Sequence, residues 1–163
     1  FMAEEIITSA LAKGLFVATA ESLTAGLICS ALVETPGSSK VVLGGINCYQ
    51  DQIKQQLLGV PSSLLQQQSA VDPEVAAHLA SQVRSKFALA MQLPEDQVIG
   101  LSSTGVAGPD TLAGKAVGEV YLGISSRLGT KVFAEQFEGS RAQIRLAARD
   151  RALEILREEL ARF

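Results

Sequence analysis

The feature that most constrains the fold is the alternation of segments with helical periodicity and short apolar runs typical of β-strands. Apolar residues at helical spacing in Glu4–Lys13 end at Gly14, and the β-type run Leu15–Thr19 follows directly. This order recurs along the chain. Further helices are expected at Thr24–Glu34, Asp51–Leu58, Pro61–Gln67, Pro73–Met91 and Ser140–Arg162, and further strands at Val41–Tyr49, Val98–Ser102, Val117–Ser125 and Lys131–Phe137. The pattern predicts an α/β fold with a parallel-rich sheet, in which a final hairpin makes one strand antiparallel.

Composition narrows the class of protein. The chain has 163 residues, 47% hydrophobic and 19% charged, which predicts one domain over residues 1–163 with a sizeable core. No apolar run approaches the roughly 20 residues that cross a bilayer, and no export leader is visible, so a cytoplasmic protein without a membrane partner is expected. A net charge of −3, 5% aromatic residues and no tryptophan argue against nucleic-acid binding.

The residues that commonly bind metals are scarce. Cys29 and Cys48 are the only cysteines, and both lie in apolar segments where a free thiol behaves as a small hydrophobe, so both are expected in the core. The only histidine, His78, lies on the expected helix at Pro73–Met91, far in sequence from every glycine-rich loop. A structural or surface role is therefore favoured for His78, a Ser–His–Asp triad is poorly supported, and no metal or cofactor is expected.

Three polar segments directly follow expected strands: "AESLTAG", "YQDQIK" and "STGVAGPDTLAGK". Ligands of such sheets bind beyond the carboxyl ends of the strands, where these loops converge. Within the first segment, Ser22 and Thr24 are open to two interpretations, as helix caps or as chemical groups. The glycine-rich third segment, Thr104–Lys115, offers backbone N–H groups to an anion or a carbonyl oxygen, and its alternative is a plain connecting loop.

Basic residues supply the remaining candidates. If the second strand neighbours the first, Lys54 approaches Ser22, and a Ser–Lys pair can replace histidine chemistry once the lysine pKa falls from about 10.4 toward neutrality. The alternative is an exposed lysine on an amphipathic helix. Arg141 and Arg145 are four residues apart near a helix start, a pattern that suits phosphate but also a solvated face paired with acids such as Glu138.

Four stretches together indicate a family. They read "ATAESLTAGLICSALVETPGSS", "GGINCYQDQIKQQLLGV", "STGVAGPDTLAGKAVGEVYLGI" and "FEGSRAQIR". In order and spacing they resemble the C-terminal domain of the CinA family, whose members include nicotinamide mononucleotide amidohydrolases. The likeness spans nearly the whole chain and implies a three-layer α/β/α sandwich with a mixed, mostly parallel sheet of about five strands, in the stand-alone amidase form.

The resemblance also implies a reaction and its residues. Nicotinamide mononucleotide would be hydrolysed to nicotinic acid mononucleotide and ammonia, with Ser22 as nucleophile and Lys54 as the base that takes its proton. Thr24 and Tyr49 would be further catalytic residues that hold hydrogen bonds around this pair. The expected substrate-binding residues, which would meet the oxyanion or the phosphate, are Thr104, Gly105, Ala107, Gly108, Arg141 and Arg145. The expected partners are this nucleotide and further copies of the chain in a homo-oligomer.

Departures from the commoner family pattern leave other functions open. Leu23 and Ala25 stand where relatives commonly carry Cys and Gly, and Ala25 is expected to have a backbone without strongly positive φ. The segment "PDTLAGK" has fewer glycines than many relatives. Two other readings therefore remain: a non-catalytic nucleotide-binding or interaction module, and an amidase of a different small amide.

Overall fold

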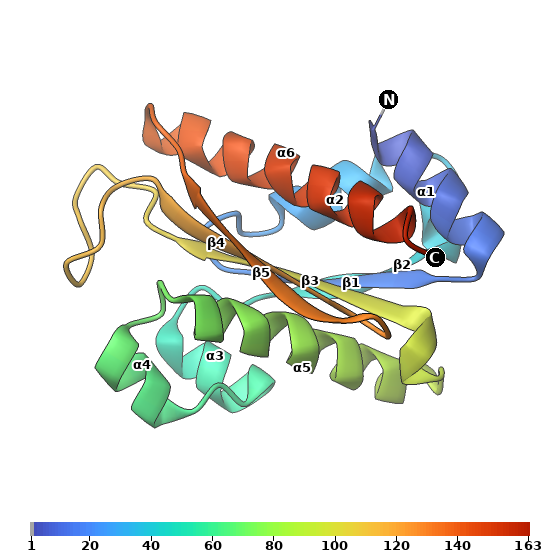
Figure 1. Cartoon of the computed structure of the whole chain (residues 1–163), viewed down its shortest axis with the longest axis horizontal. Coiled ribbons are helices and arrows are strands. Elements are labelled where there is room, and N and C mark those ends of the chain that lie inside the picture. The colour runs from blue at the N-terminus through green and yellow to red at the C-terminus, as the bar shows by residue number, and fades with distance from the viewer. Residues whose placement is uncertain (1) are drawn as a thin grey trace.

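A five-stranded sheet in the order β2-β1-β3-β4-β5 organises the computed structural model, which describes residues 2–163 (Figure 1). The strands are β1 (Phe16–Glu21), β2 (Val42–Asn47), β3 (Val98–Gly105), β4 (Glu119–Ser126) and β5 (Gly129–Gln136). Strand β1 pairs in parallel with β2 and β3, whereas β4 pairs antiparallel with both β3 and β5. Strand β4 alone therefore runs against the other strands, which confirms the mixed, mostly parallel sheet and the hairpin.

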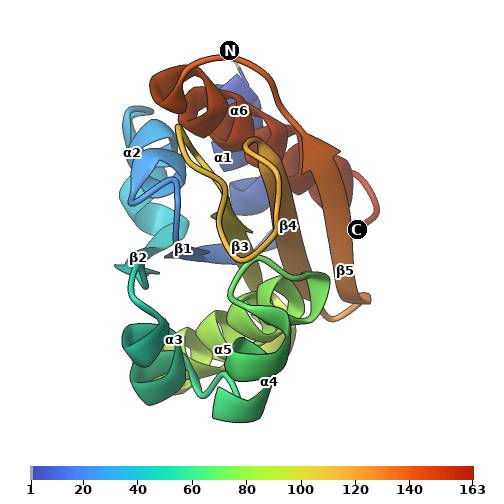
Figure 2. The ribbon, with the colours of Figure 1, turned by 90° about the vertical axis from the view of Figure 1, so that its left-hand side faces the viewer.

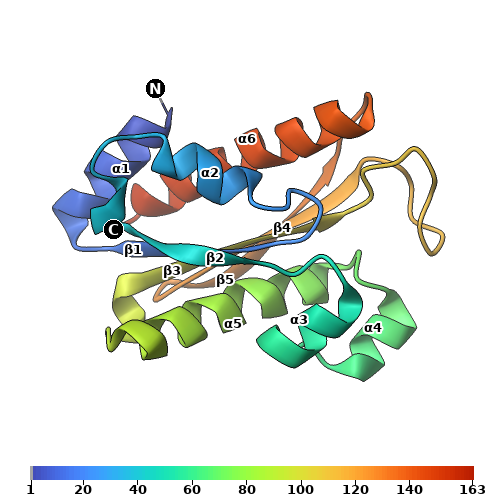
Figure 3. The same cartoon turned by 180° about the vertical axis from the view of Figure 1, so that it is seen from behind.

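Helices cover both faces of this sheet. They are α1 (Met2–Lys13), α2 (Leu27–Val33), α3 (Asp51–Leu58), α4 (Ser62–Gln68), α5 (Pro73–Met91) and α6 (Arg141–Leu160). Helices α1, α2 and α6 lie on one face and α3, α4 and α5 on the other (Figures 1 and 3). Alternation along β1 sends Val17 into the core under the first layer and Ala18 into the core under the second. The three-layer α/β/α sandwich is confirmed.

The turn between β1 and α2 differs from expectation. Strand β1 continues through Glu21, and α2 begins at Leu27 rather than at Thr24. The intervening chain reverses tightly, because the Ala25 N–H donates to Ser22 O at 3.1 Å, and Ala25 and Gly26 have φ of 45° and 98°. The prediction that Ala25 avoids positive φ is wrong: the tight turn imposes a left-handed conformation on it.

The topology brings three loops to one edge of the sheet. Strands β1, β2 and β3 are adjacent and parallel, so the segments after them meet beyond their carboxyl ends (Figure 2). His78 lies on α5 and is half-buried, Cys48 is buried and Cys29 is half-buried. Within residues 2–163, every helix is too short or too polar to cross a bilayer.

Candidate active site

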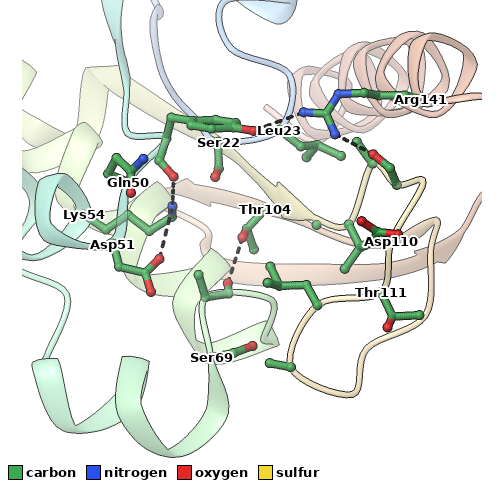
Figure 4. Close-up of a pocket in the computed structure, with 18 of the residues that line it drawn as sticks. Ser22, Leu23, Gln50, Asp51, Lys54, Ser69, Thr104, Asp110, Thr111 and Arg141 are labelled. Atoms are coloured by element: carbon green, nitrogen blue, oxygen red, sulfur yellow. Dashed lines mark hydrogen bonds and ion pairs between the residues drawn. The ribbon is translucent and has the colours of Figure 1, made fainter.

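A cavity of about 680 Å³ opens where the three loops meet, a size typical of small-molecule sites (Figure 4). Its wall comes from the turn after β1, the start of α3, the loop before α5, the glycine-rich loop after β3 and the start of α6. The expected site residues that line it are Ser22, Tyr49, Lys54, Thr104, Gly105, Ala107, Gly108 and Arg141. Thr24 and Arg145 are not part of this wall.

Ser22 lies on the cavity wall at the end of β1. Its backbone N–H donates to Ser103 O at 3.0 Å, and its hydroxyl makes no hydrogen bond to any other residue of the described chain. The capping interpretation is wrong, because the N-cap of α2 is Gly26 and no side chain of Ser22 or Thr24 caps it. The buried Glu21 carboxylate instead accepts the N–H groups of Gly26, Ile28 and Cys29 at 2.9 to 3.1 Å. The Ser22 hydroxyl is thus available to a ligand.

Lys54, on α3, is a buried part of the cavity wall. Its side chain is 1% exposed, which excludes the exposed-lysine interpretation. The ammonium donates to Tyr49 O at 3.0 Å and lies 3.9 Å from the carboxylate of Asp51. Burial lowers the pKa of Lys54, and the charges of Cys48 and Asp51 partly oppose this. Ser22 and Lys54 do not hydrogen-bond to each other, but both face the same space (Figure 4).

The hydroxyl groups of Thr24, Thr104 and Tyr49 form hydrogen bonds to other groups of the protein. Thr24 is fully buried, and its Oγ1 lies 2.6 Å from Ser103 Oγ, so it ties the turn to β3. Thr104 Oγ1 donates to Ala70 O at 2.7 Å, which leaves only its lone pairs for a ligand. The Tyr49 hydroxyl accepts from Arg141 Nη2 at 3.1 Å. Tyr49 therefore touches Lys54 through its carbonyl and Arg141 through its side chain.

The two candidate arginines on α6, Arg141 and Arg145, contact different parts of the site. Arg141 is exposed, and its Nη1 donates to Gly108 O at 2.6 Å, which links α6 to the glycine-rich loop. Arg145 is half-buried, and it donates to Leu23 O at 2.7 Å and to Thr24 O at 3.3 Å. Neither guanidinium forms an ion pair with a carboxylate in the described part of the chain. Both arginines therefore bind only neutral oxygens.

The glycine-rich loop keeps several N–H groups free. The Ala107 and Gly108 N–H groups have no acceptor among residues 2–163, and both residues are buried at the cavity. The base of the loop is closed by Gly118, which donates to Val106 O at 2.8 Å. Gly118 has φ of +87°, and a Cβ there would lie 1.8 Å from Phe137 O, so only glycine fits. Two successive free N–H groups form a concavity suited to an anion.

Sequence reasoning missed two groups that shape the site. Glu21 stands inside the quoted motif without a role, and the only signal was an acid at the end of an otherwise apolar strand. Asp51 stands three residues before Lys54, the spacing of neighbours on one helix face. Across residues 2–163, no three His, Cys, Asp or Glu side chains gather as a metal site would require.

Comparison with known proteins places this chain in a family. Residues 1–160 match the CinA C-terminal domain, and the chain belongs to that family. It is 42% identical over 159 residues to a CinA-like protein of Desulfotalea psychrophila, a match that covers 96% of this chain and 36% of that protein. The chain therefore spans about a third of the length of the curated relatives it matches.

Solved structures share the fold. The competence/damage inducible protein CihA from Agrobacterium tumefaciens superposes with a TM-score of 0.86 at 35% identity, over 98% of this chain and 93% of that one. A CinA superfamily protein from Klebsiella pneumoniae gives a TM-score of 0.89 at 23% identity, over 99% of this chain and 97% of that one. The family resemblance deduced from the four motifs is thereby confirmed.

Proposed function

We propose that this chain hydrolyses the carboxamide of nicotinamide mononucleotide to nicotinic acid mononucleotide and ammonia. One observation carries the proposal: a fully buried lysine with a lowered pKa shares a cavity with an unpaired serine hydroxyl at a strand end. Burial of a lysine lowers protein stability, so a buried lysine is expected where its neutral amine acts as a base. Family membership adds support for hydrolase chemistry, and the particular substrate is part of the proposal.

The proposed chemistry uses Ser22 and Lys54 as nucleophile and base. Neutral Lys54 takes the hydroxyl proton as Ser22 Oγ bonds to the carboxamide carbon, and the carbonyl electron pair moves onto oxygen. The carbonyl re-forms as the carbon–nitrogen bond breaks, and Lys54 returns the proton to the leaving ammonia. Water then attacks the Ser22 ester by the same proton path, which releases the carboxylic acid and restores Ser22.

We assign phosphate recognition to the part of the cavity formed by Arg141 and the glycine-rich loop. Arg141 has no carboxylate partner among residues 2–163, and the free N–H groups of Ala107 and Gly108 lie on the same loop that Arg141 contacts. A guanidinium and two backbone donors suit a phosphate dianion. Gly105 and Thr104 also line the cavity.

The experiment that tests this function is ammonia release from a panel of amides. The panel contains nicotinamide mononucleotide, its phosphate-free nucleoside, nicotinamide, asparagine and glutamine, and the Ser22→Ala variant is the control. We expect ammonia from the mononucleotide at the highest kcat/KM and none above background from the control. Ammonia only from another amide would replace the substrate, and none from any amide would favour a binding module.

A further inference from the structure

In the turn that carries Ser22, the backbone carbonyl groups are hydrogen-bonded within the protein, whereas two backbone N–H groups are not. Every carbonyl from residue 21 to residue 24 accepts a hydrogen bond within the protein. In chain order the donors are Cys48 N at 2.9 Å, Ala25 N at 3.1 Å, Arg145 Nε at 2.7 Å, and Leu27 N at 3.0 Å together with Arg145 Nη2 at 3.3 Å. In contrast, the N–H groups of Leu23 and Thr24 have no acceptor among residues 2–163. Of these two donors, only the N–H of Leu23 belongs to a residue that lines the cavity, since Thr24 is fully buried and lies outside the cavity wall.

Arg145 binds the two carbonyls that follow the Leu23 N–H in the chain. Both of its hydrogen bonds go to the turn, it is absent from the cavity wall, and it has no carboxylate partner in the described chain. The C=O and N–H of a trans peptide point in opposite directions. By binding the carbonyls of Leu23 and Thr24, Arg145 fixes the two peptide planes that follow Leu23 and so limits how the turn can rotate.

The end of the turn next to α2 is bound by a negatively charged side chain, that of Glu21, whereas Arg145 is positively charged. The buried carboxylate of Glu21 accepts three N–H groups at the start of α2, from Gly26, Ile28 and Cys29. An anion on the N–H groups and a cation on the carbonyl groups fix the turn from both sides, since charged partners make the stronger hydrogen bonds. The turn thus has little freedom to rotate its peptide planes.

We infer that the N–H of Leu23, a residue that lines the cavity, forms the oxyanion hole for attack by Ser22, and that Arg145 is a positioning residue that holds the turn carrying this N–H. The inference rests on the proposed function. Negative charge develops on the substrate oxygen as Ser22 Oγ bonds to the carbon, and a donor already fixed beside Ser22 would stabilise it. In other serine hydrolases the N–H after the nucleophile has this task. The free donors of Ala107 and Gly108 are then left for phosphate.

The test compares Arg145→Ala and Arg145→Lys with Arg149→Ala. Arg149 lies one helical turn further along α6 and pairs only with Asp150, so it is a matched control. Steady-state kcat and KM are measured on the mononucleotide and on its phosphate-free nucleoside. In parallel, sulfonylation of Ser22 by phenylmethanesulfonyl fluoride is followed by mass spectrometry, because this step forms an oxygen–sulfur bond, expels fluoride, passes the proton to Lys54 and needs no amide substrate.

We expect Arg145→Ala to lower kcat by roughly 10²-fold on both substrates, the effect of losing an oxyanion donor, with KM changed only slightly. Sulfonylation of Ser22 should slow in parallel, while thermal melting confirms a folded protein. Arg145→Lys, which has one ammonium for two carbonyls, should recover part of both rates, and it replaces the alanine variant if that variant fails to fold. Arg149→Ala should match the parent.

Three outcomes overturn the inference. A rise in KM for the mononucleotide alone, with kcat unchanged, would make Arg145 a phosphate ligand. Unchanged sulfonylation in both Arg145 variants would show that the Leu23 donor does not depend on Arg145, and a parent chain that is never labelled at Ser22 would remove the oxyanion hole itself. If the parent hydrolyses no amide but Ser22 is labelled more slowly in the variants, the proposed function fails and the oxyanion hole stands.

Discussion

Two loops at the same edge of the sheet are built in opposite ways. The turn at residues 22–26 is mostly buried, and charged side chains bind it from both sides. The loop at residues 106–118 is exposed over residues 109–114; backbone hydrogen bonds and a contact from Arg141 close its base, and its exposed tip is held only by the backbone pair Leu112–Lys115. The difference fits the proposed division of roles, with bond breaking on the more constrained turn and ligand recognition on the more exposed loop.

The largest expected effect is the loss of turnover when Lys54, the proposed base, is replaced. Lys54→Met and Lys54→Arg should each lower turnover by at least roughly 10³-fold, because neither side chain can take the serine proton at neutral pH. His78→Ala should keep nearly full turnover, since His78 is not on the cavity wall. Ammonia release measures all three. An active Lys54→Met with an inactive His78→Ala would replace the lysine mechanism by one based on histidine.

The next effect is on stability. Glu21→Ala leaves three N–H groups at the start of α2 without their acceptor, which should lower the free energy of unfolding by roughly 3 kcal/mol. Glu21→Gln keeps the shape and one acceptor oxygen, so it should cost less. Urea denaturation gives both values, with Glu34→Ala, an exposed acid at the other end of α2, as control. If Glu21→Ala is as stable as this control, the turn is not held as described.

A smaller and more selective effect is expected at the exposed loop. Arg141→Ala should raise KM for the mononucleotide by roughly tenfold and leave kcat/KM for the phosphate-free nucleoside nearly unchanged, because only the mononucleotide brings an anion. Together with the Arg145 variants, this separates two arginines that are one helical turn apart. Equal losses on both substrates would assign Arg141 to the fold or to the chemistry.

The smallest effect concerns pH. Asp51 lies 3.9 Å from the Lys54 ammonium, and its charge raises the pKa of Lys54 against the lowering by burial. Asp51→Asn removes that charge, so the pKa of Lys54 should fall and the neutral base should persist to lower pH. The acidic limb of kcat/KM against pH should therefore move slightly to lower pH. A shift to higher pH would contradict Lys54 as the titrating base.

Sequence patterns predicted the helices and strands of the three-layer sandwich, because the hydrophobic periodicity of each helix or strand can be read within its own segment. They also located the three loops, since strand ends were readable. They did not predict which face α3 buries: Ile53 and Leu57 are 36% and 48% exposed, whereas Lys54 is buried on the same face as Leu58. Hydrophobic periodicity would have placed Ile53 and Leu57 inward. The inversion is a departure of the kind expected at a functional site.

The contacts of Arg145 also could not be predicted from local sequence patterns. Its two acceptors lie 122 and 121 residues away in sequence, in a turn where Ala25 adopts a left-handed conformation that the sequence analysis did not expect. Spacing on the helix placed Arg145 correctly beside Arg141 but predicted the same ligand for both. Contacts of this separation depend on the tertiary fold, which no pattern within one segment contains.

The central claim is that Ser22 attacks the amide with Lys54 as its base, and a double-mutant cycle on ammonia release tests it most directly. The four proteins are the parent, Ser22→Ala, Lys54→Met and the double variant, each checked for folding by thermal melting. Because the two residues act as one unit, the double variant should be little worse than either single variant. Ser22→Ala with the turnover of the parent chain would contradict the account.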